Sequence, residues 1–328
     1  MRAGDANLSD CEPDSCSGRA PRPDAVAFDL VPDSRGCGPA VPMSSTSLRP
    51  PRAPTDPRSP AAWDGTSLLT RPGLIRVPAV ITAWFWVIKV FTTAQGEATS
   101  DYFVHFPRVS PYLVVAGGFV VFVAAMALQL RVQRYIPAVY WLAVTMVAVF
   151  GTMCADAIHI QLGVPYWATT SAFAVAVAVV FWAWYRTEGT LSIHSVVTLR
   201  RELFYWAAVL ATFALGTAWG DLMAFTLNLG FLTAGILFAV VIAIPALAHR
   251  FAGMGPVLAF WFAYVITRPL GATFADWMGF PTTTHSALGW GHGAVSLLFT
   301  ALIAAGVLYL AMSRVDVEPV RSPLPKPA

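Results

Sequence analysis

Charged side chains are scarce in this chain. Asp, Glu, Lys and Arg make up 12% of its 328 residues, whereas hydrophobic residues make up 56%. A soluble globular domain carries roughly 25% charged residues, so the composition argues against a soluble protein. The net charge of +3 is too small for the basic surface that nucleic acid requires, and we expect no nucleic-acid partner. The composition is typical of a membrane protein.

Cysteine is also scarce, and motifs of catalysis are missing. Cys11, Cys16 and Cys37 lie near the N-terminus with a spacing that matches no zinc signature. The sequence has no HExxH, GxSxG or P-loop motif, which would indicate a metalloprotease, a hydrolase or a nucleotide-driven protein. We therefore expect no enzyme and no cofactor other than a bound divalent cation, and any transport would depend on an existing gradient.

The first 75 residues differ in composition from the rest. They hold 12 of the 25 prolines, and their eight arginines are nearly balanced by nine acidic residues. Such a segment cannot bury enough apolar surface to offset the entropy of ordering, so residues 1–75 are predicted to be a disordered tail. It has no apolar stretch of the kind that a signal peptide needs, and Met43 offers an alternative start. Residues 315–328 are expected to form a short C-terminal tail.

Eight apolar stretches lie within residues 76–314, each near the ~20 residues that a helix needs to cross a bilayer. They cover 77–102, 111–130, 135–158, 165–185, 202–225, 230–249, 255–278 and 288–312. The loop arginines fall almost entirely on one side, and cytoplasmic loops carry the excess of basic residues. The sequence predicts an all-α polytopic bundle of eight transmembrane helices in a bacterial plasma membrane. Both termini are then cytoplasmic, and self-association into a homo-oligomer is left open.

The odd-numbered stretches share a fourfold repeat. Each copy opens with an aromatic residue and Trp, has Gly ten residues after the Trp, and has Asp five residues after the Gly. The glycines are Gly96, Gly151, Gly216 and Gly271, and the aspartates are Asp101, Asp156, Asp221 and Asp276. The residue after each Gly is Glu97, Thr152, Thr217 or Ala272. Each unit is two helices long, so the four hairpins are parallel repeats over about 77–131, 132–190, 197–250 and 252–312. A pseudo-fourfold ring and two pairs of hairpins are equally compatible with this pattern.

The first and last copies resemble known repeats. Residues 85–102 read FWVIKVFTTAQGEATSDY, and residues 267–277 read TRPLGATFADW. They are similar to the opening and closing repeats of a family of uncharacterised bacterial membrane-anchored repeat proteins, over roughly residues 76–314. This resemblance implies an all-helical repeat membrane protein, and it brings no established activity and no catalytic residues.

The repeated glycines have two interpretations. A glycine lets neighbouring backbone approach closely in a membrane, which makes all four candidate helix-packing residues. Alternatively, the helix unwinds locally and presents carbonyl oxygens to an ion. That alternative is strongest at Gly271, because Pro269 weakens the same helical turn.

The repeated aspartates fall near the outer ends of their helices, where the helix dipole disfavours negative charge. Either hydrogen bonds from a neighbouring hairpin or a shared cation would compensate for this. Glu97 lies one turn before Asp101 and on the same helix face. Oxygen-rich sites favour Mg, Ca or Mn, and further ligand candidates are the hydroxyls of Thr152 and Thr217 and the imidazole of His159.

Two basic residues, Lys89 and Arg268, fall at membrane depth, where neither can stay unpaired. Each is therefore expected to have a carboxylate or backbone carbonyls within reach. Arg268 is expected to pair with Glu97 or with an aspartate of another repeat.

The sequence supports two functions of different classes. One is a gradient-driven transporter of a small cation, a divalent metal or a coupled proton, with the repeated carboxylates as ligands. The other is a non-catalytic membrane scaffold in which the repeat is only a packing motif.

Overall fold

A computed structural model describes residues 75–104 and 109–317 of the chain. Over these residues every regular element is a helix and there is no β-strand. The predicted N-terminal tail, including Met43 and the three cysteines near the N-terminus, lies outside the described residues, as does most of the C-terminal tail.

Each repeat supplies a first and a second helix, joined by a turn. The first helices are α2 (Ala83–Val104), α4 (Pro137–Asp156), α6 (Leu199–Asp221) and α9 (Pro256–Gly279). The second helices are α3 (Pro111–Arg131), α5 (Tyr166–Glu188), α7 (Phe231–Val241) with α8 (Ala243–Phe251), and α10 (His292–Ser313). The short elements are the π-helical segments η1 (Ala157–Gln161) and η3 (Leu222–Thr226) and the 3-10 turn η2 (Ile193–Ser195).

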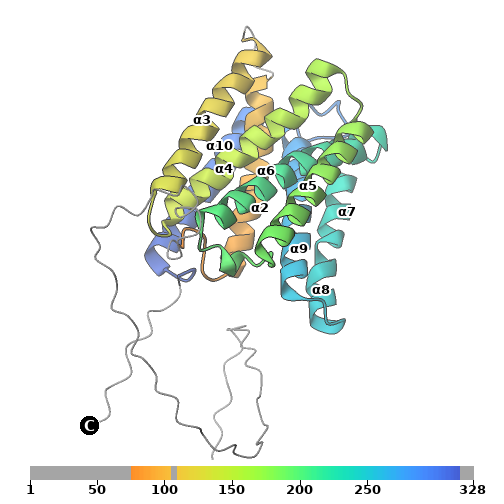
Figure 1. Ribbon diagram of the computed structural model, residues 1–328. Helices are drawn as coiled ribbons and strands as arrows, with labels where there is room; N and C mark the ends of the chain where they lie inside the picture. Colours follow the sequence, from red (N-terminus) through yellow and green to blue (C-terminus); the bar gives the residue numbers. More distant parts are fainter. Residues whose placement is uncertain (1–74, 105–108, 318–328) are drawn as a thin grey trace, which may run out of the picture. The chain divides into compact units, whose positions relative to one another are not determined.

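The first helices form a closed ring. α2 packs against α4, α4 against α6, α6 against α9, and α9 returns to α2. Each second helix lies outside this ring and packs more extensively against the first helix of the next repeat than against its own. Thus α3 packs on α4, α5 on α6, α7 on α9, and α10 on α2 (Figure 1). Of the two arrangements that the sequence allows, the structure has the ring.

The outer helices present apolar side chains to the surroundings. Within the described residues, seven helical spans are long and apolar enough to cross a membrane. In the most apolar window of the outer spans only 11–28% of residues are buried, against 56–67% for α4, α6 and α9. This is the pattern of a multi-pass membrane protein, in which lipid covers the outer surface. The eighth predicted span, α2, is less apolar because it carries Lys89, Glu97 and Asp101.

Helix boundaries follow local sequence signals, with two departures from the expected spans. Proline occupies the first position of α3, α4 and α9, where its missing amide proton costs nothing. The first helix begins at Ala83 rather than at residue 77, because Arg76 and Val77 are buried in a non-helical segment. The predicted helix 230–249 is interrupted at Ile242, since Pro245 lacks the amide proton that would bond to the carbonyl of Val241.

The end of the ring near the basic loops is closed by packing and by polar contacts. The aromatic pairs that open the repeats lie in one buried cluster, in which the hydroxyls of Tyr140 and Tyr205 are 2.6 Å apart. Beside it, Arg76 Nη1 lies 2.7 Å from Glu202 Oε2, and Gln129 Nε2 donates to Glu202 Oε1. These contacts join the first three repeats at that end.

Candidate functional site

The repeated glycines are the points at which the ring helices touch. A Cβ atom at Gly96 would lie 2.9 Å from the carbonyl carbon of Ala148 on α4, and one at Gly151 would lie 2.8 Å from Phe213 Cβ on α6. The same construction at Gly216 meets Arg268 Cβ on α9 at 2.5 Å. At Gly271 it meets Thr93 Cβ on α2 at 2.8 Å. Each glycine therefore allows the first helix of the next repeat to pack closely, and the contact at Gly271 closes the ring.

The alternative of local unwinding at Gly271 is wrong. Helix α9 continues from Pro256 to Gly279 through Pro269 without a break. The space at Gly271 is filled by Thr93 and by the amide nitrogen of Ala94, so the neighbouring helix, and not an ion, occupies this position.

Arg268 lies inside the ring with no exposed surface. Its Nη2 is 2.6 Å from Glu97 Oε2 and 2.6 Å from Thr217 Oγ1, and it also donates to Thr152 Oγ1. Its Nη1 donates to the carbonyl of Thr93 at 3.2 Å. The residues that follow the glycines of the first three repeats thus meet around one guanidinium. The ion pair with Glu97 is the pairing expected for Arg268.

Lys89 is also buried, but its described partners are uncharged. Its ammonium lies 4.3 Å from the ring centre of Phe213 and 4.2 Å from that of Tyr264, and 3.5 Å from Thr267 Oγ1. Aromatic faces attract cations through their quadrupole. The expectation of a carboxylate or a backbone carbonyl beside Lys89 is therefore wrong for the contacts that the structure describes.

The four aspartates are buried one to two turns beyond Arg268. Asp101, Asp156, Asp221 and Asp276 are 7%, 9%, 8% and 3% exposed. Carboxylate oxygens of Glu97, Asp221 and Asp276 lie within 4.8 Å of one another. Asp276 also has a ligand atom within 4.8 Å of Asp101 and of the His292 imidazole. We call these five carboxylates, with His292, the carboxylate cluster.

Contacts within the cluster run between repeats. Ser100 Oγ donates to Asp156 Oδ2 at 3.1 Å, and His292 Nδ1 lies 3.2 Å from Asp101 Oδ2. Thr217 Oγ1 donates to Glu97 Oε2 at 3.1 Å. In these contacts repeat 1 meets repeats 2, 4 and 3 in turn. Each of these contacts therefore crosses from one repeat to another.

Several residues in or beside the cluster carry no repeat signal. His292 begins α10, Ser100 precedes the first repeated aspartate, and Tyr166 begins α5 within electrostatic reach of Asp221. Their helices bring them to the aspartates of the neighbouring repeat. The spacing of residues within one hairpin does not predict such contacts between repeats. His159 is a candidate that the structure places elsewhere. Its Nδ1 is 2.7 Å from the carbonyl of Val164, and its ring stacks on Tyr166.

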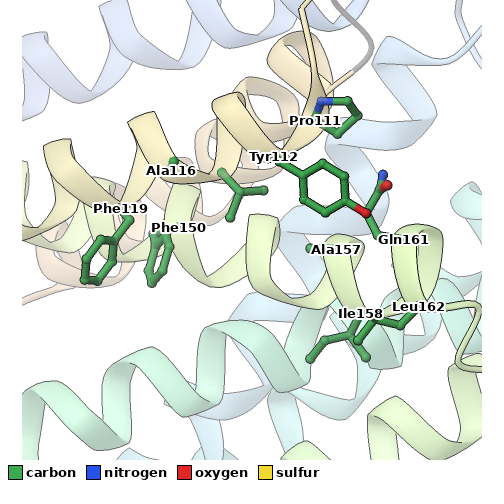
Figure 2. A pocket seen from close by; sticks show the side chains of 10 residues that line it. Pro111, Tyr112, Ala116, Phe119, Phe150, Ala157, Ile158, Gln161 and Leu162 are labelled. Carbon is green, nitrogen blue, oxygen red and sulfur yellow. The ribbon is translucent and has the colours of Figure 1, made fainter.

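A separate pocket of about 440 Å³ lies between α3 and the end of α4. Figure 2 shows its lining side chains, among them Phe119, Phe150 and Leu162, with the polar groups of Tyr112 and Gln161 at one end. The pocket shares no residue with the carboxylate cluster. Its lining is mostly apolar, and none of its lining residues is an Asp, Glu, His or Cys.

The chain belongs to a family of repeat proteins. A family model described as Repeat of Unknown Function (DUF347) matches residues 84–135, 139–190, 204–254 and 259–316. The four matches confirm the suspected family and its fourfold repeat, and each covers the first helix of one repeat with the second helix that follows. Comparison with curated proteins and with solved structures gave no match.

Proposed function

We propose that this protein is a membrane transporter that moves a small cation through the carboxylate cluster. The observation that carries the proposal is that four buried carboxylates, those of Glu97, Asp101, Asp221 and Asp276, are linked through Asp276 by distances within 4.8 Å, and the buried Asp156 lies within electrostatic reach of Asp276. Ionisable groups at membrane depth are costly and mark ion pathways by default. Protein packing alone would not require an aspartate at the same place in every repeat.

Charge balance supports the same proposal. In the described part of the chain, Arg268 pairs with Glu97 and His292 lies beside Asp101, and Asp156, Asp221 and Asp276 are buried in the same ring. Asp276 lies within electrostatic reach of Glu97, Asp101, Asp156 and Asp221. Like charges this close cannot all stay ionised without compensation. Protons or a bound divalent cation would neutralise them, and either is a plausible cargo for a gradient-driven carrier.

The proposed topology gives the site a direction. We infer eight transmembrane helices in a bacterial plasma membrane, with α2 as the eighth and both termini in the cytoplasm. Along α2, the order from the basic end is Phe85, Lys89, Glu97 and Asp101. The cluster would then face the exterior, and the Arg268–Glu97 pair with the aromatic cluster would separate it from the cytoplasm.

A scaffold remains the second candidate, and the glycine contacts favour it. At every repeated glycine, the next helix occupies the space that a side chain would need. A packing motif without any transport function would show the same contacts. In that case the N-terminal tail would recruit a partner and the carboxylates would only join the repeats.

Transport assays separate the two candidates. The full chain, reconstituted in liposomes, should take up a divalent metal or protons when a gradient is imposed. Asp276→Asn and Glu97→Gln should reduce the uptake rate by at least about tenfold, because each removes a cluster charge and keeps the side-chain shape. Asp316→Asn is the control, since Asp316 is a buried carboxylate outside the cluster that bonds to Tyr135. Equal uptake by the wild-type protein and all three variants, or no uptake above that of empty liposomes, would contradict the transporter proposal and favour the scaffold.

A further inference from the structure

One corner of the carboxylate cluster contains a nitrogen donor. One ligand atom each from Asp101, Asp276 and His292 lie within 4.8 Å of one another. They come from α2, α9 and α10, which meet where the last repeat closes on the first. The His292 side chain is 15% exposed, so the corner is buried but lies next to the surface.

A second observation points to a ligand at this corner. Asp276 is 3% exposed, its carboxyl group lies against that of Asp101, and no hydrogen-bond donor reaches its Oδ1 among the described residues. An unsatisfied carboxylate oxygen in such a place carries a large desolvation cost. A metal ion among the three side chains would compensate for it, and the Arg268 guanidinium is already paired with Glu97.

The fold holds the imidazole in place. A Cβ atom at Gly279 would lie 2.7 Å from His292 Nδ1, so only glycine there leaves room for the ring. The ring of Phe280 packs edge-on against His292 with the ring centres 4.7 Å apart. The amides of Trp290 and Gly291 donate to the carbonyls of Met278 and Gly279 at 2.9 and 3.2 Å. These contacts fix the start of α10 against the end of α9.

Of the four second helices that the structure describes, only α10 begins with a histidine, and α3 begins with Pro111. Among the second helices that the structure describes, α5 begins with Tyr166 and α7 with Phe231, whereas α10 begins with His292. His292 Nδ1 lies 3.2 Å from Asp101 Oδ2, whereas Tyr166 lies only within electrostatic reach of Asp221. Of the two groups of ligand atoms that the structure describes, the one formed by Asp101, Asp276 and His292 has both nitrogen and oxygen donors.

We propose that Asp101, Asp276 and His292 bind a divalent first-row transition metal, and that this metal is the cation handled by the cluster. Imidazole with carboxylates suits Mn, Fe, Co or Zn, whereas Mg and Ca prefer oxygen alone. The identity of the cargo rests on the proposed function. The binding site itself does not, because a metal can be held without being moved.

Cobalt binding tests the site directly. Purified full-length protein in detergent is titrated with Co²⁺, and its affinity and visible absorption are compared with those of the variants. His292→Gln should weaken Co²⁺ binding by more than about tenfold, a loss that even outer partners of metal ligands cause, and should alter the absorption because the nitrogen ligand is lost. Mg²⁺ should compete poorly with Co²⁺ for the wild-type protein. His194→Gln, at the opposite end of the chain's helices, is the control.

Further variants keep the outcomes distinct. Asp276→Asn should abolish binding, and Gly279→Ala should weaken it without removing a ligand, because the added methyl group displaces the imidazole. Unchanged Co²⁺ affinity and absorption in His292→Gln, or Mg²⁺ competing as well as Co²⁺, would overturn the proposal. Proton uptake by a protein that binds no Co²⁺ would overturn the metal-site proposal and support the transporter proposal. Tight Co²⁺ binding without uptake of any cation would support the metal site and overturn the transporter proposal.

Discussion

At the scale of single residues, the position after each repeated glycine is the most informative. Glu97, Thr152 and Thr217 direct their oxygens at Arg268, and the fourth repeat has Ala272 there and provides Arg268 itself. The repeats therefore differ at two positions, the one after the glycine and the one three residues before it, and Glu97 and Arg268 at these positions form a buried ion pair. Such a pair adds little net stability, because desolvation offsets the attraction, but it is costly to split.

Splitting this pair should destabilise the protein strongly. Arg268→Met leaves Glu97 without its cation in a buried site, and the loss should be about 3–5 kcal/mol. Thermal unfolding in detergent would show a large fall in the midpoint temperature. Adding Glu97→Gln to Arg268→Met should recover part of the lost stability, because no unpaired carboxylate then remains buried at position 97. A double variant no more stable than the single one would mean that Arg268 acts through packing and not through the pair.

At the scale of helices, the ring is built from glycine contacts. The glycines lie five residues before the aspartates in the same helices, so the contacts that draw neighbouring helices together also bring the carboxylates toward one another. Close approach through small residues is a common means of helix association in membranes, where the hydrophobic effect gives no drive. The packing motif and the candidate site are thus parts of one arrangement.

A larger residue at one of these contacts should open the ring. Gly271→Leu would overlap Thr93 and the backbone of α2, and overpacking of this kind costs at least about 1–3 kcal/mol. Size-exclusion chromatography of the detergent extract should show little monodisperse protein. Gly117→Leu on α3 is the matched control, because a side chain there meets no atom within 4 Å. A well-behaved Gly271→Leu protein would contradict a contact this tight.

At the scale of the whole molecule, closure of the ring joins the first repeat to the last. The hydroxyls of Thr99 on α2 and Ser296 on α10 are 2.6 Å apart, although nearly 200 residues separate them in the chain. Closure also places Asp101 beside Asp276 and His292. The candidate metal corner therefore exists only in the complete set of four repeats.

The proposed orientation can be tested with reporters fused at two turns. A reporter near Asn228, between η3 and α7, should read as extracytoplasmic, and one near Thr190, between α5 and α6, as cytoplasmic. The reason is that Arg200 and Arg201, both bonded to Glu188, lie at the second turn, and basic loops stay inside. An alkaline phosphatase and fluorescent protein pair would measure this. The opposite reading at both turns would reverse the side from which a cation reaches the cluster.

The sequence by itself determined the class of the molecule, the helical spans and the repeat. These are local properties, since hydrophobic length and the spacing of Trp, Gly and Asp are readable along the chain. It also indicated that Arg268 would find a carboxylate, because a cation in hydrocarbon needs one. Only the tertiary structure decided between a ring and two pairs, excluded unwinding at Gly271, and gave Lys89 aromatic neighbours. It also brought His292 to the cluster, because that contact depends on how the last helix closes on the first, which no local spacing encodes.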